Sequence, residues 1–383
     1  MKLMEDIAIV GIGCTPVGEP WDKSLRSIAV ESTWNAMDDA GVDQVDGLVV
    51  GNMSSGNFID QESLGPLIVD YAGLGNITAF KVEGACGSGG AALHAGAMAV
   101  ASGYHDTVCV TGVEKMTDVV GDSATKILSN ASDREYEAIH GVSFPGLNAM
   151  IMRRYMHDYN VKREDICSFP VNSHKHAVKN KYAMFRREIS LDSVLNSPMV
   201  ADPMTLMDCA PICDGAASLI LTTKEKAHEY TDTPIYIKAN SVKTDTIGVH
   251  DRKTVTSMRA TVEAAREAFS ISGLSPKDIE TAEMHDAFSI MGVIGLEDIG
   301  FVERGQGAKF AADGQIAIGG SLPCCTHGGL KARGHPVGAT GVYQVVELCR
   351  NLRGEGVIDV SNGLAQNIGG TGSTVAVTIL GRD

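Results

Sequence analysis

The sequence is poor in aromatic residues and has no long hydrophobic run. Only 5% of its 383 residues are Phe, Trp or Tyr, and two of these are Trp. No stretch approaches the roughly 20 consecutive apolar residues that span a bilayer. Residues 1–6 lead directly into a strand-like segment, without the basic and apolar regions of a signal peptide. We therefore expect a soluble, cytoplasmic protein that has no membrane partner.

Positive charge is also scarce. The 47 Asp and Glu residues outnumber the 32 Lys and Arg residues, which leaves a formal net charge of -15 at pH 7. This balance argues against a nucleic-acid partner, because a protein that binds the phosphate backbone presents a basic surface to it. One cationic segment, 174–187, stands out from this background. It is either a solvated helix face or a surface that receives a phosphorylated ligand.

Paired cysteine motifs are missing. The nine cysteines are odd in number and scattered, which fits reduced thiols better than a disulfide framework. Cys209 and Cys213 are four residues apart, and Cys324 and Cys325 are adjacent, so neither pair has the CxxC spacing of a structural zinc site. We expect no metal site.

Strand-like and helical segments alternate along the first part of the chain. Apolar runs at 7–13, 45–50 and 107–114 read as buried strands, and 24–40 reads as an amphipathic helix. This alternation indicates a layered α/β unit with a mainly parallel sheet.

After Met116 the pattern changes and later returns. Residues 118–206 are polar and lack a buried-strand pattern, and a strand pattern resumes at 214–222. From 235 onward the chain repeats the first layout without evident sequence identity. We therefore divide it into an N-terminal half, an inserted loop domain and a C-terminal half, at residues 1–117 with 207–228, 118–206 and 233–383.

One cysteine lies among glycines in segment 82–97. Strand-like residues precede Cys86 and small apolar residues with helical character follow it, which predicts a strand, a tight turn carried by glycines, and a buried helix. A cysteine at a helix N-terminus meets the positive end of the dipole, which favours the thiolate. The alternative is a small buried side chain where two helices touch.

Three further elements are candidates to act with this thiol. His285 follows a strand, and ligands bind at the ends of parallel strands. His335 is framed by glycines and precedes Pro336. Segment 365–372 is rich in glycine and offers backbone amides for an oxyanion hole. Each histidine has a structural alternative, since a lone histidine is often a satisfied core residue.

Together, the stretches around Cys86, His285, His335 and Gly369 resemble the thiolase superfamily over essentially the whole chain, most closely the archaeal acetoacetyl-CoA thiolases, which are related to sterol-carrier-type thiolases. The resemblance implies an α/β thiolase fold with five αβαβα layers from two similar halves and an inserted loop domain. It implies that Cys86 is the nucleophile, that His335 activates it, and that both histidines polarise the thioester oxygen. The backbone amides of Cys86 and Gly369 would form a second oxyanion hole.

The sequence departs from the family at the acid/base. Asn367 stands where many thiolases have a cysteine in a CxG motif, and Ala287 stands where sterol-carrier-type thiolases have the cysteine of an HDCF motif. A base for the α-proton is still required. We expect Cys325 to supply it, with Cys324 and His327 as further candidates. The alternative for Cys325 is a small residue packed beneath the site.

The resemblance implies an acetyl-CoA C-acetyltransferase that condenses two acetyl-CoA to acetoacetyl-CoA and coenzyme A through an acetyl-cysteine, and catalyses the reverse thiolysis. It would supply mevalonate synthesis, with coenzyme A thioesters as substrates, no other cofactor, and coenzyme A bound along the loop domain. Expected partners are a second copy in a dimer or tetramer, and a 3-hydroxy-3-methylglutaryl-CoA synthase bridged by a small OB-fold protein. The alternatives are a 3-oxoacyl-CoA thiolase for longer chains and a non-catalytic acyl-CoA binding or scaffold protein.

Overall fold

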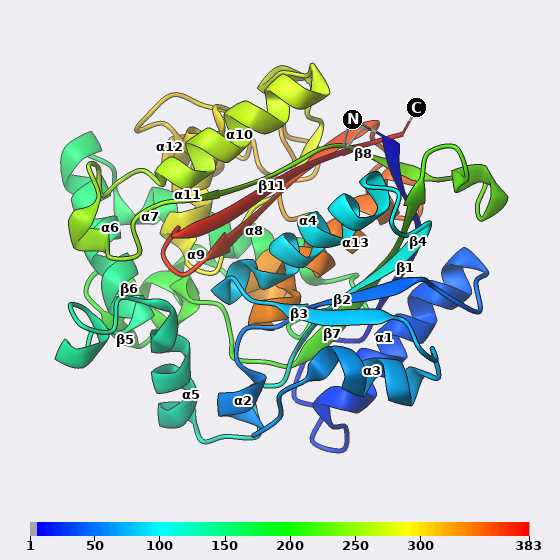
Figure 1. Ribbon diagram of the computed structural model, residues 1–383. Coiled ribbons are helices and arrows are strands. Elements are labelled where there is room, and N and C mark those ends of the chain that lie inside the picture. The colour runs from blue at the N-terminus through cyan, green and yellow to red at the C-terminus, as the bar shows by residue number, and fades with distance from the viewer. Residues whose placement is uncertain (1–5, 383) are drawn as a thin grey trace.

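A computed structural model describes residues 6–382; residues 1–5 and 383, the outer ends of the two predicted halves, lie outside the described range. A nine-stranded sheet runs through the molecule in the order β3-β2-β4-β7-β1-β8-β11-β10-β9 (Figure 1). Its first five strands are β3 (Thr78–Val82), β2 (Gly47–Gly51), β4 (Thr107–Glu114), β7 (Gly215–Thr223) and β1 (Ile7–Cys14). The other four are β8 (Ile235–Thr244), β11 (Thr374–Gly381), β10 (Asn362–Gly369) and β9 (Thr281–Glu283).

The two parts of the sheet repeat one arrangement. They join where, within the described residues, β1 pairs with β8 at two positions, Ala8 with Tyr236 and Ile9 with Ile235. Outward from this junction, β1, β7, β4 and β2 correspond to β8, β11, β10 and β9. A bridge from Ala282 to Cys324 stands where β3 stands in the first half. The chain therefore consists of two similar halves, as the sequence predicts.

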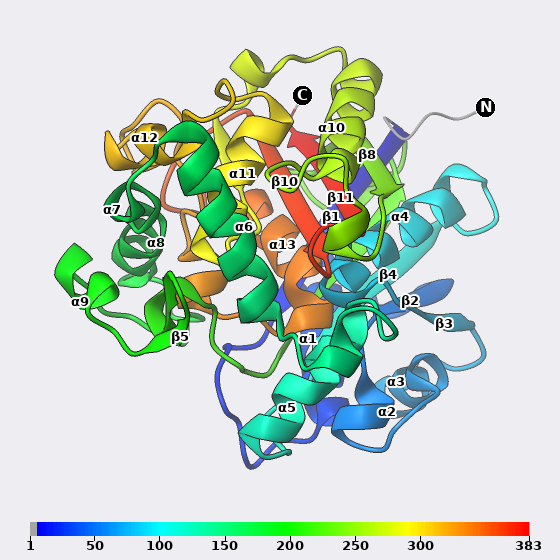
Figure 2. The same ribbon diagram turned by 90° about the vertical axis from the view of Figure 1, so that its left-hand side faces the viewer.

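Five layers result from the way helices cover these strands. Helices α4 (Ser88–Ala101) and α13 (Thr340–Leu352) contact each other and lie between the two parts of the sheet. The outer face of the first half carries α1 (Leu25–Ala40) and α3 (Leu64–Ala72). The outer face of the second half carries α10 (Arg259–Ser272) and α11 (Ser289–Ile299), and both outer layers are visible in Figures 1 and 2.

The central helices approach closely because glycines face each other across their contact. A Cβ on Gly341 would lie 2.4 Å from the backbone nitrogen of Gly90, and a Cβ on Gly89 would lie 2.9 Å from that of Gly341. These are backbone atoms that cannot rotate away. This contact holds the turn that contains Cys86, before α4, close to the segment that contains His335, before α13.

Alanine at Gly341 should lower the thermal midpoint of unfolding, since the overpacked contact costs about 1–3 kcal/mol. Gly121, the first residue of α5 (Gly121–Leu128), is the matched control, because an added Cβ there has no neighbour within 4 Å. Gly121→Ala should leave the midpoint unchanged or raise it, since alanine favours helix over glycine. Equal midpoints for the two variants would contradict the close contact.

The prediction of a mainly parallel sheet is wrong. Within the described chain, β2 runs parallel to β3 and β4, and β9 runs parallel to β10, while the other five neighbouring pairs are antiparallel. Strand β7 comes after the long segment 118–214 rather than after a crossover helix, and a tight turn joins β10 to β11. Hydrophobic runs identify buried strands but carry no information about their direction.

The polar segment 118–206 is mainly helical, and its helices α6 and α8 lie against the second half. Helices α6 and α8 contact α11. One short hairpin, β5–β6, is an exception to the expected absence of strands. The elements here are α5, α6 (Phe144–Tyr159), α7 (Arg163–Ile166), α8 (Ser168–Ala177), α9 (Leu191–Leu195), β5 (Met199–Ala201) and β6 (Met204–Thr205). Two more short helices lie elsewhere, α2 (Ser55–Phe58) and α12 (Gly307–Ala312). No helix within residues 6–382 is both long and apolar enough to cross a membrane.

Candidate active site

Cys86 lies in a single 3₁₀ turn between β3 and α4, as the sequence predicts. The reversal is carried by Ala85, whose φ is 53°, and not by the flanking glycines, so the expected role of Gly84 and Gly87 in the turn is wrong. Gly87 instead permits close approach, because a Cβ there would lie 3.1 Å from the nitrogen of Gly369. The Ser88 hydroxyl donates to the Ala85 carbonyl at 2.6 Å, which holds the turn in this conformation.

Cys86, His285 and His335 line one cavity of ≈ 80 Å³. They are its three polar side chains in the described chain. The remaining lining is the backbone of Gly370 and apolar side chains, namely Met116, Leu128, Phe144, Ala210, Pro211, Ile212, Ala287, Phe288, Met291 and Val337. A site of this kind combines one nucleophile with two imidazoles in surroundings that strengthen electrostatic interactions.

The hydrogen bonds of His335 assign its tautomer. Its Nδ1 lies 2.6 Å from the Thr340 hydroxyl, which donates its own proton to the Pro336 carbonyl at 3.1 Å. Since a hydroxyl has one proton, it accepts from Nδ1–H, and the neutral imidazole then carries a free lone pair on Nε2. Burial, with the neighbouring His285 ring and the charge of Arg333, holds the pKa of His335 well below its usual range, so the ring is neutral at pH 7.

The hydrogen bonds of His285 assign the opposite tautomer. Its Nδ1 accepts the backbone N–H of Ile368 at 3.2 Å, so the proton of the neutral ring is on Nε2. Burial, with the charge of Arg333, lowers the pKa of His285 to about 3. The two rings stand edge to face with centroids 5.1 Å apart. His285 therefore offers an N–H donor where His335 offers an acceptor.

The Cys86 thiol is protonated at rest, which corrects the expectation of a thiolate stabilised by the helix dipole. Burial and the nearby Glu114 carboxylate raise the pKa of Cys86 to about 12. The backbone N–H groups of Gly370 and of Cys86 oppose this increase without cancelling it. The thiol therefore requires a base before it can attack a thioester.

Alkylation of Cys86 by iodoacetamide should be slow at pH 7 and should accelerate about tenfold per pH unit up to pH 9, because only the thiolate reacts and its fraction rises tenfold per unit below the pKa. Mass spectrometry of the peptide that contains Cys86 measures this rate. A rate already maximal at pH 7 would show a thiolate at rest.

The amide that faces the thiol is that of Gly370, one residue beyond the predicted Gly369. Gly370 lines the cavity and directs its N–H at the Cys86 sulfur. Gly369 lies just behind, where a Cβ would be 2.1 Å from the Gly84 carbonyl oxygen. Gly369 therefore allows β10 to approach the nucleophile turn, and the N–H pair of Cys86 and Gly370 is available to a developing oxyanion.

Asn367 has a role that the sequence did not reveal. Its amide nitrogen donates to the Cys86 carbonyl at 3.0 Å, and its amide oxygen accepts the Gly90 N–H at 3.0 Å. The same nitrogen lies 3.5 Å from Nδ1 of His285. Asn367 therefore ties the nucleophile turn of one half to the histidine of the other.

Glu114, at the end of β4, is a second residue that sequence reasoning missed. Its carboxylate accepts four hydrogen bonds, from the side chain of Asn52 and the backbone N–H groups of Met53, Ser54 and Gly338. Burial raises its pKa to about 7. It fastens the loop after β2 to the turn that follows His335. The partners are up to 224 residues apart in sequence, so no local motif indicates them.

The candidate acid/base residues do not reach the cavity. Cys325, Cys324 and His327 are absent from its described lining. The Cys325 thiol donates to the Met284 carbonyl at 3.5 Å and that of Cys324 to the Leu322 carbonyl at 3.2 Å. His327 is 5% exposed, and its ring contacts Thr326. In this arrangement all three belong to the packing behind the site.

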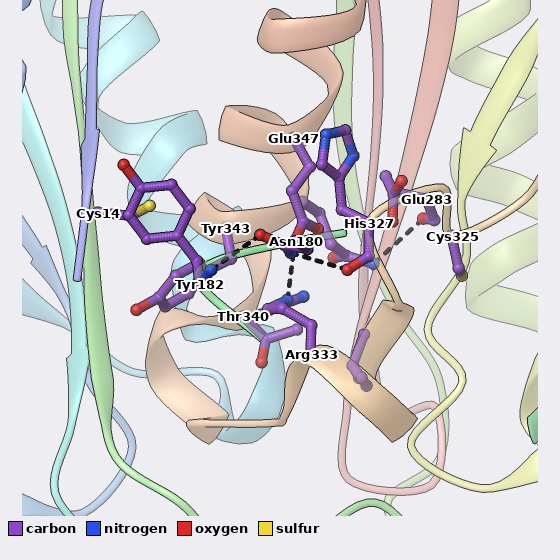
Figure 3. Close-up of polar contacts among 12 residues, drawn as sticks. Cys14, Asn180, Tyr182, Glu283, Cys325, His327, Arg333, Thr340, Tyr343 and Glu347 are labelled. Carbon is purple, nitrogen blue, oxygen red and sulfur yellow. Dashed lines mark hydrogen bonds and ion pairs between the residues drawn. The ribbon is translucent and has the colours of Figure 1, made fainter. Parts of the chain in front are cut away.

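A buried cluster of charges lies behind both histidines. Arg333 is fully buried, pairs with Glu347 at 3.1 Å and lies over the ring of Tyr343 (Figure 3). Glu283 and Asp286, which flank His285, are buried beside it and carry raised pKa values through burial. Three carboxyl groups, those of Glu347, Glu283 and Asp286, therefore lie near one guanidinium. The glycine-rich sequence around Arg333 does not predict this cluster.

The cationic segment 174–187 spans the end of α8 and the loop that follows. Five of its cations are exposed, namely Lys175, Lys179, Lys181, Arg186 and Arg187. His174 is buried, stacks on Phe185 and contacts the Arg187 carbonyl at 3.0 Å. The segment therefore presents positive charge to solvent on a backbone that is held in place.

Two family models cover nearly the whole chain. The model for the thiolase N-terminal domain matches residues 7–225, and the one described as thiolase C-terminal domain-like matches residues 241–382. The chain is 49% identical over 385 residues to the acetyl-CoA acetyltransferase of Methanothermobacter thermautotrophicus, covering 99% of this chain and 100% of that relative. It is 44% identical over 390 residues to the acetyl-CoA acetyltransferase of Methanocaldococcus jannaschii, covering 98% and 99%.

A solved structure has the same architecture. The Ltp2-ChsH2(DUF35) aldolase superposes with a TM-score of 0.88 at 30% identity, covering 100% of this chain and 99% of that one. The resemblance seen in the sequence and the predicted layered fold are thereby confirmed. By its two matching domains, its full-length relatives and its fold, the chain belongs to the thiolase family.

Proposed function

We propose that this chain is an acetyl-CoA C-acetyltransferase that condenses two acetyl-CoA to acetoacetyl-CoA and coenzyme A, and catalyses the reverse thiolysis. One observation carries the proposal: a thiol, an imidazole acceptor, an imidazole donor and a pair of backbone N–H groups surround one apolar cavity. These are the groups that transfer of an acyl group through a thioester requires. The two archaeal relatives named as acetyl-CoA acetyltransferases support the same activity.

In the first half-reaction, the Cys86 thiolate attacks the acetyl carbonyl and coenzyme A departs, which leaves acetyl-Cys86. The tetrahedral oxyanion is stabilised by the N–H groups of Cys86 and Gly370. In the second, the enolate of another acetyl-CoA attacks acetyl-Cys86. His285 donates Nε2–H to the enolate oxygen and thereby stabilises its charge.

The decisive test is mass spectrometry after incubation with acetoacetyl-CoA, alongside an assay of acetyl-CoA condensation. We expect an acetyl adduct on the peptide that contains Cys86 and release of free coenzyme A. Binding of the thioester without an adduct would support the alternative of a non-catalytic acyl-CoA binding or scaffold protein.

The size of the cavity favours short acyl chains over the longer 3-oxoacyl chains of the second candidate function. A cavity of about 150 Å³ can hold benzene, which has six heavy atoms. The ≈ 80 Å³ here is lined by large side chains such as Phe144, Phe288 and Met291. Thiolysis of acetoacetyl-CoA should therefore be much faster than that of a 3-oxoacyl-CoA with a long chain, and equal kcat/KM values for both would contradict this reading.

We propose that the enzyme acts in the cytoplasm, supplies mevalonate synthesis, and binds coenzyme A along the loop domain, where segment 174–187 offers exposed cations. Further proposed partners are a 3-hydroxy-3-methylglutaryl-CoA synthase and a small OB-fold bridging protein. Co-purification from the native source tests this, and recovery of the chain alone would contradict it.

The proposed homodimer or tetramer has one structural argument. Strand β3 is the edge of the sheet, and its Phe80 is 44% exposed. An exposed apolar edge strand is a site for pairing with another chain. Phe80→Lys should reduce the mass measured by light scattering to that of a smaller species, whereas an unchanged mass would place the interface elsewhere.

A further inference from the structure

We propose that His335 is the base of both half-reactions, removing first the thiol proton of Cys86 and then the α-proton of the second acetyl-CoA, so that the chain works without a separate acid/base side chain. The inference rests on the proposed condensation and names the group that performs its second proton transfer. It replaces the cysteines that the sequence suggested.

The lining of the cavity leaves few alternatives. In the described chain, Cys86, His285 and His335 are the titratable residues that line it. Cys86 is acylated when the α-proton has to be removed. Glu114 lies close to Cys86, but both its oxygens are occupied by hydrogen-bond donors. Cys325 turns its thiol to the Met284 carbonyl.

The tautomers then separate the two histidines. A base needs an unprotonated nitrogen that faces the substrate. The Ile368 N–H occupies Nδ1 of His285 and leaves a protonated Nε2, which is a donor. In His335, Nδ1–H donates to the Thr340 hydroxyl, so Nε2 is unprotonated and can accept a proton. Within residues 6–382, this Nε2 has no hydrogen-bond partner. His335 is the one of the pair that can accept a proton.

The position of His335 suits a base that serves two sites. In the part of the chain that the structure describes, no hydrogen bond joins the Cys86 sulfur to either imidazole; instead all three groups face the same cavity. The Pro336 carbonyl and Thr340 fix the ring from behind. Because His335 is held, within the described residues, without a hydrogen bond to the thiol, it can still accept a proton after the Cys86 sulfur has been acetylated.

The protons balance over the cycle. In the first half-reaction, Nε2 takes the Cys86 proton, the carbon–sulfur bond to Cys86 forms as that to coenzyme A breaks, and the proton passes to the departing coenzyme A sulfur. In the second, Nε2 takes the α-proton, the new carbon–carbon bond forms, and the bond from the acetyl carbon to Cys86 breaks. The proton on His335 then returns to the Cys86 sulfur, which restores the thiol and the neutral imidazole.

The experiment separates removal of the α-proton from activation of the thiol. In the Cys86→Ala protein no acetyl-enzyme forms, so exchange of the acetyl-CoA methyl protons with deuterium from D2O reports enolisation alone. We expect this exchange in Cys86→Ala, and its loss by at least about 100-fold when His335→Gln is added. Adding Cys325→Ala should leave it unchanged. Exchange that survives His335→Gln, or that is lost with Cys325→Ala, overturns the proposal.

A second pair of variants guards against a folding defect in His335→Gln. Thr340→Val removes the acceptor for Nδ1–H, and Thr340→Ser keeps it. Thr340→Val should slow Cys86 acetylation and, in the Cys86→Ala background, deuterium exchange, while Thr340→Ser restores both. Slowing of acetylation alone would assign the α-proton to another base. A wild-type protein that forms no acetyl-Cys86 would instead refute the proposed function itself, which keeps the two failures distinct.

Discussion

Cys86→Ala is expected to lower both condensation and thiolysis by at least about 10³-fold, because removal of a catalytic nucleophile leaves only the contribution of binding and of the oxyanion donors. Its side chain is small and adjoins a cavity, so the thermal midpoint should change little. Steady-state assays of coenzyme A release measure the effect. Mass spectrometry should show no acetyl adduct in the variant.

Cys349→Ala is the matched control for this loss. Cys349 is a buried cysteine on α13 that does not line the cavity within the described chain. Its replacement should leave the rates close to those of the wild type and the acetyl adduct on Cys86 intact. If Cys349→Ala and Cys86→Ala lose activity to the same extent, the nucleophile assignment is wrong.

Arg333→Leu is expected to destabilise the protein by about 3–5 kcal/mol, the cost of leaving a buried charge without its partner. Arg333 is fully buried, and its removal takes the ion-pair partner from Glu347 and a buried neighbouring cation from Glu283 and Asp286. Glu347 and Asp286 must then either remain charged in an apolar environment or bind a proton. Thermal unfolding at pH 7 measures the loss.

Two comparisons identify the buried charge as the cause. Arg382→Leu removes a cation that pairs with Asp359 at 2.8 Å, but both side chains are exposed, and such pairs contribute at most about 1 kcal/mol. The double variant Arg333→Leu, Glu347→Leu should recover part of the stability, because it removes one stranded carboxylate with the cation. An Arg333→Leu protein as stable as Arg382→Leu would contradict the role of the cluster.

The sequence was sufficient for groups whose surroundings are local. Cys86 and His335 lie in glycine-rich segments, and His285 follows a strand, so their neighbours in sequence indicated candidates that the structure brings to one cavity. Two details at Cys86 were misassigned: the left-handed residue of its turn is Ala85 and not a flanking glycine, and the thiol is protonated at rest.

It was insufficient for groups defined by contacts between distant segments. Asn367 contacts a carbonyl 281 residues away, and the amide at the thiol belongs to Gly370 because β10 meets the nucleophile turn at that register. Cys325 adjoins a glycine-rich turn in sequence, yet its backbone, with φ 53°, directs the thiol into the core. Neither a strand's direction nor a side chain's direction follows from residue type alone.

The two similar halves have a consequence for how such an enzyme arises. The first half supplies the thiol in the turn before α4, and the second half supplies both imidazoles and the amide of Gly370, so the chemistry exists only where the two halves meet. A single half, however well folded, holds a nucleophile without a base or a base without a nucleophile. An origin by duplication would therefore require two copies side by side before this activity could arise. The activity therefore belongs to the two halves together, and the single chain keeps them covalently joined.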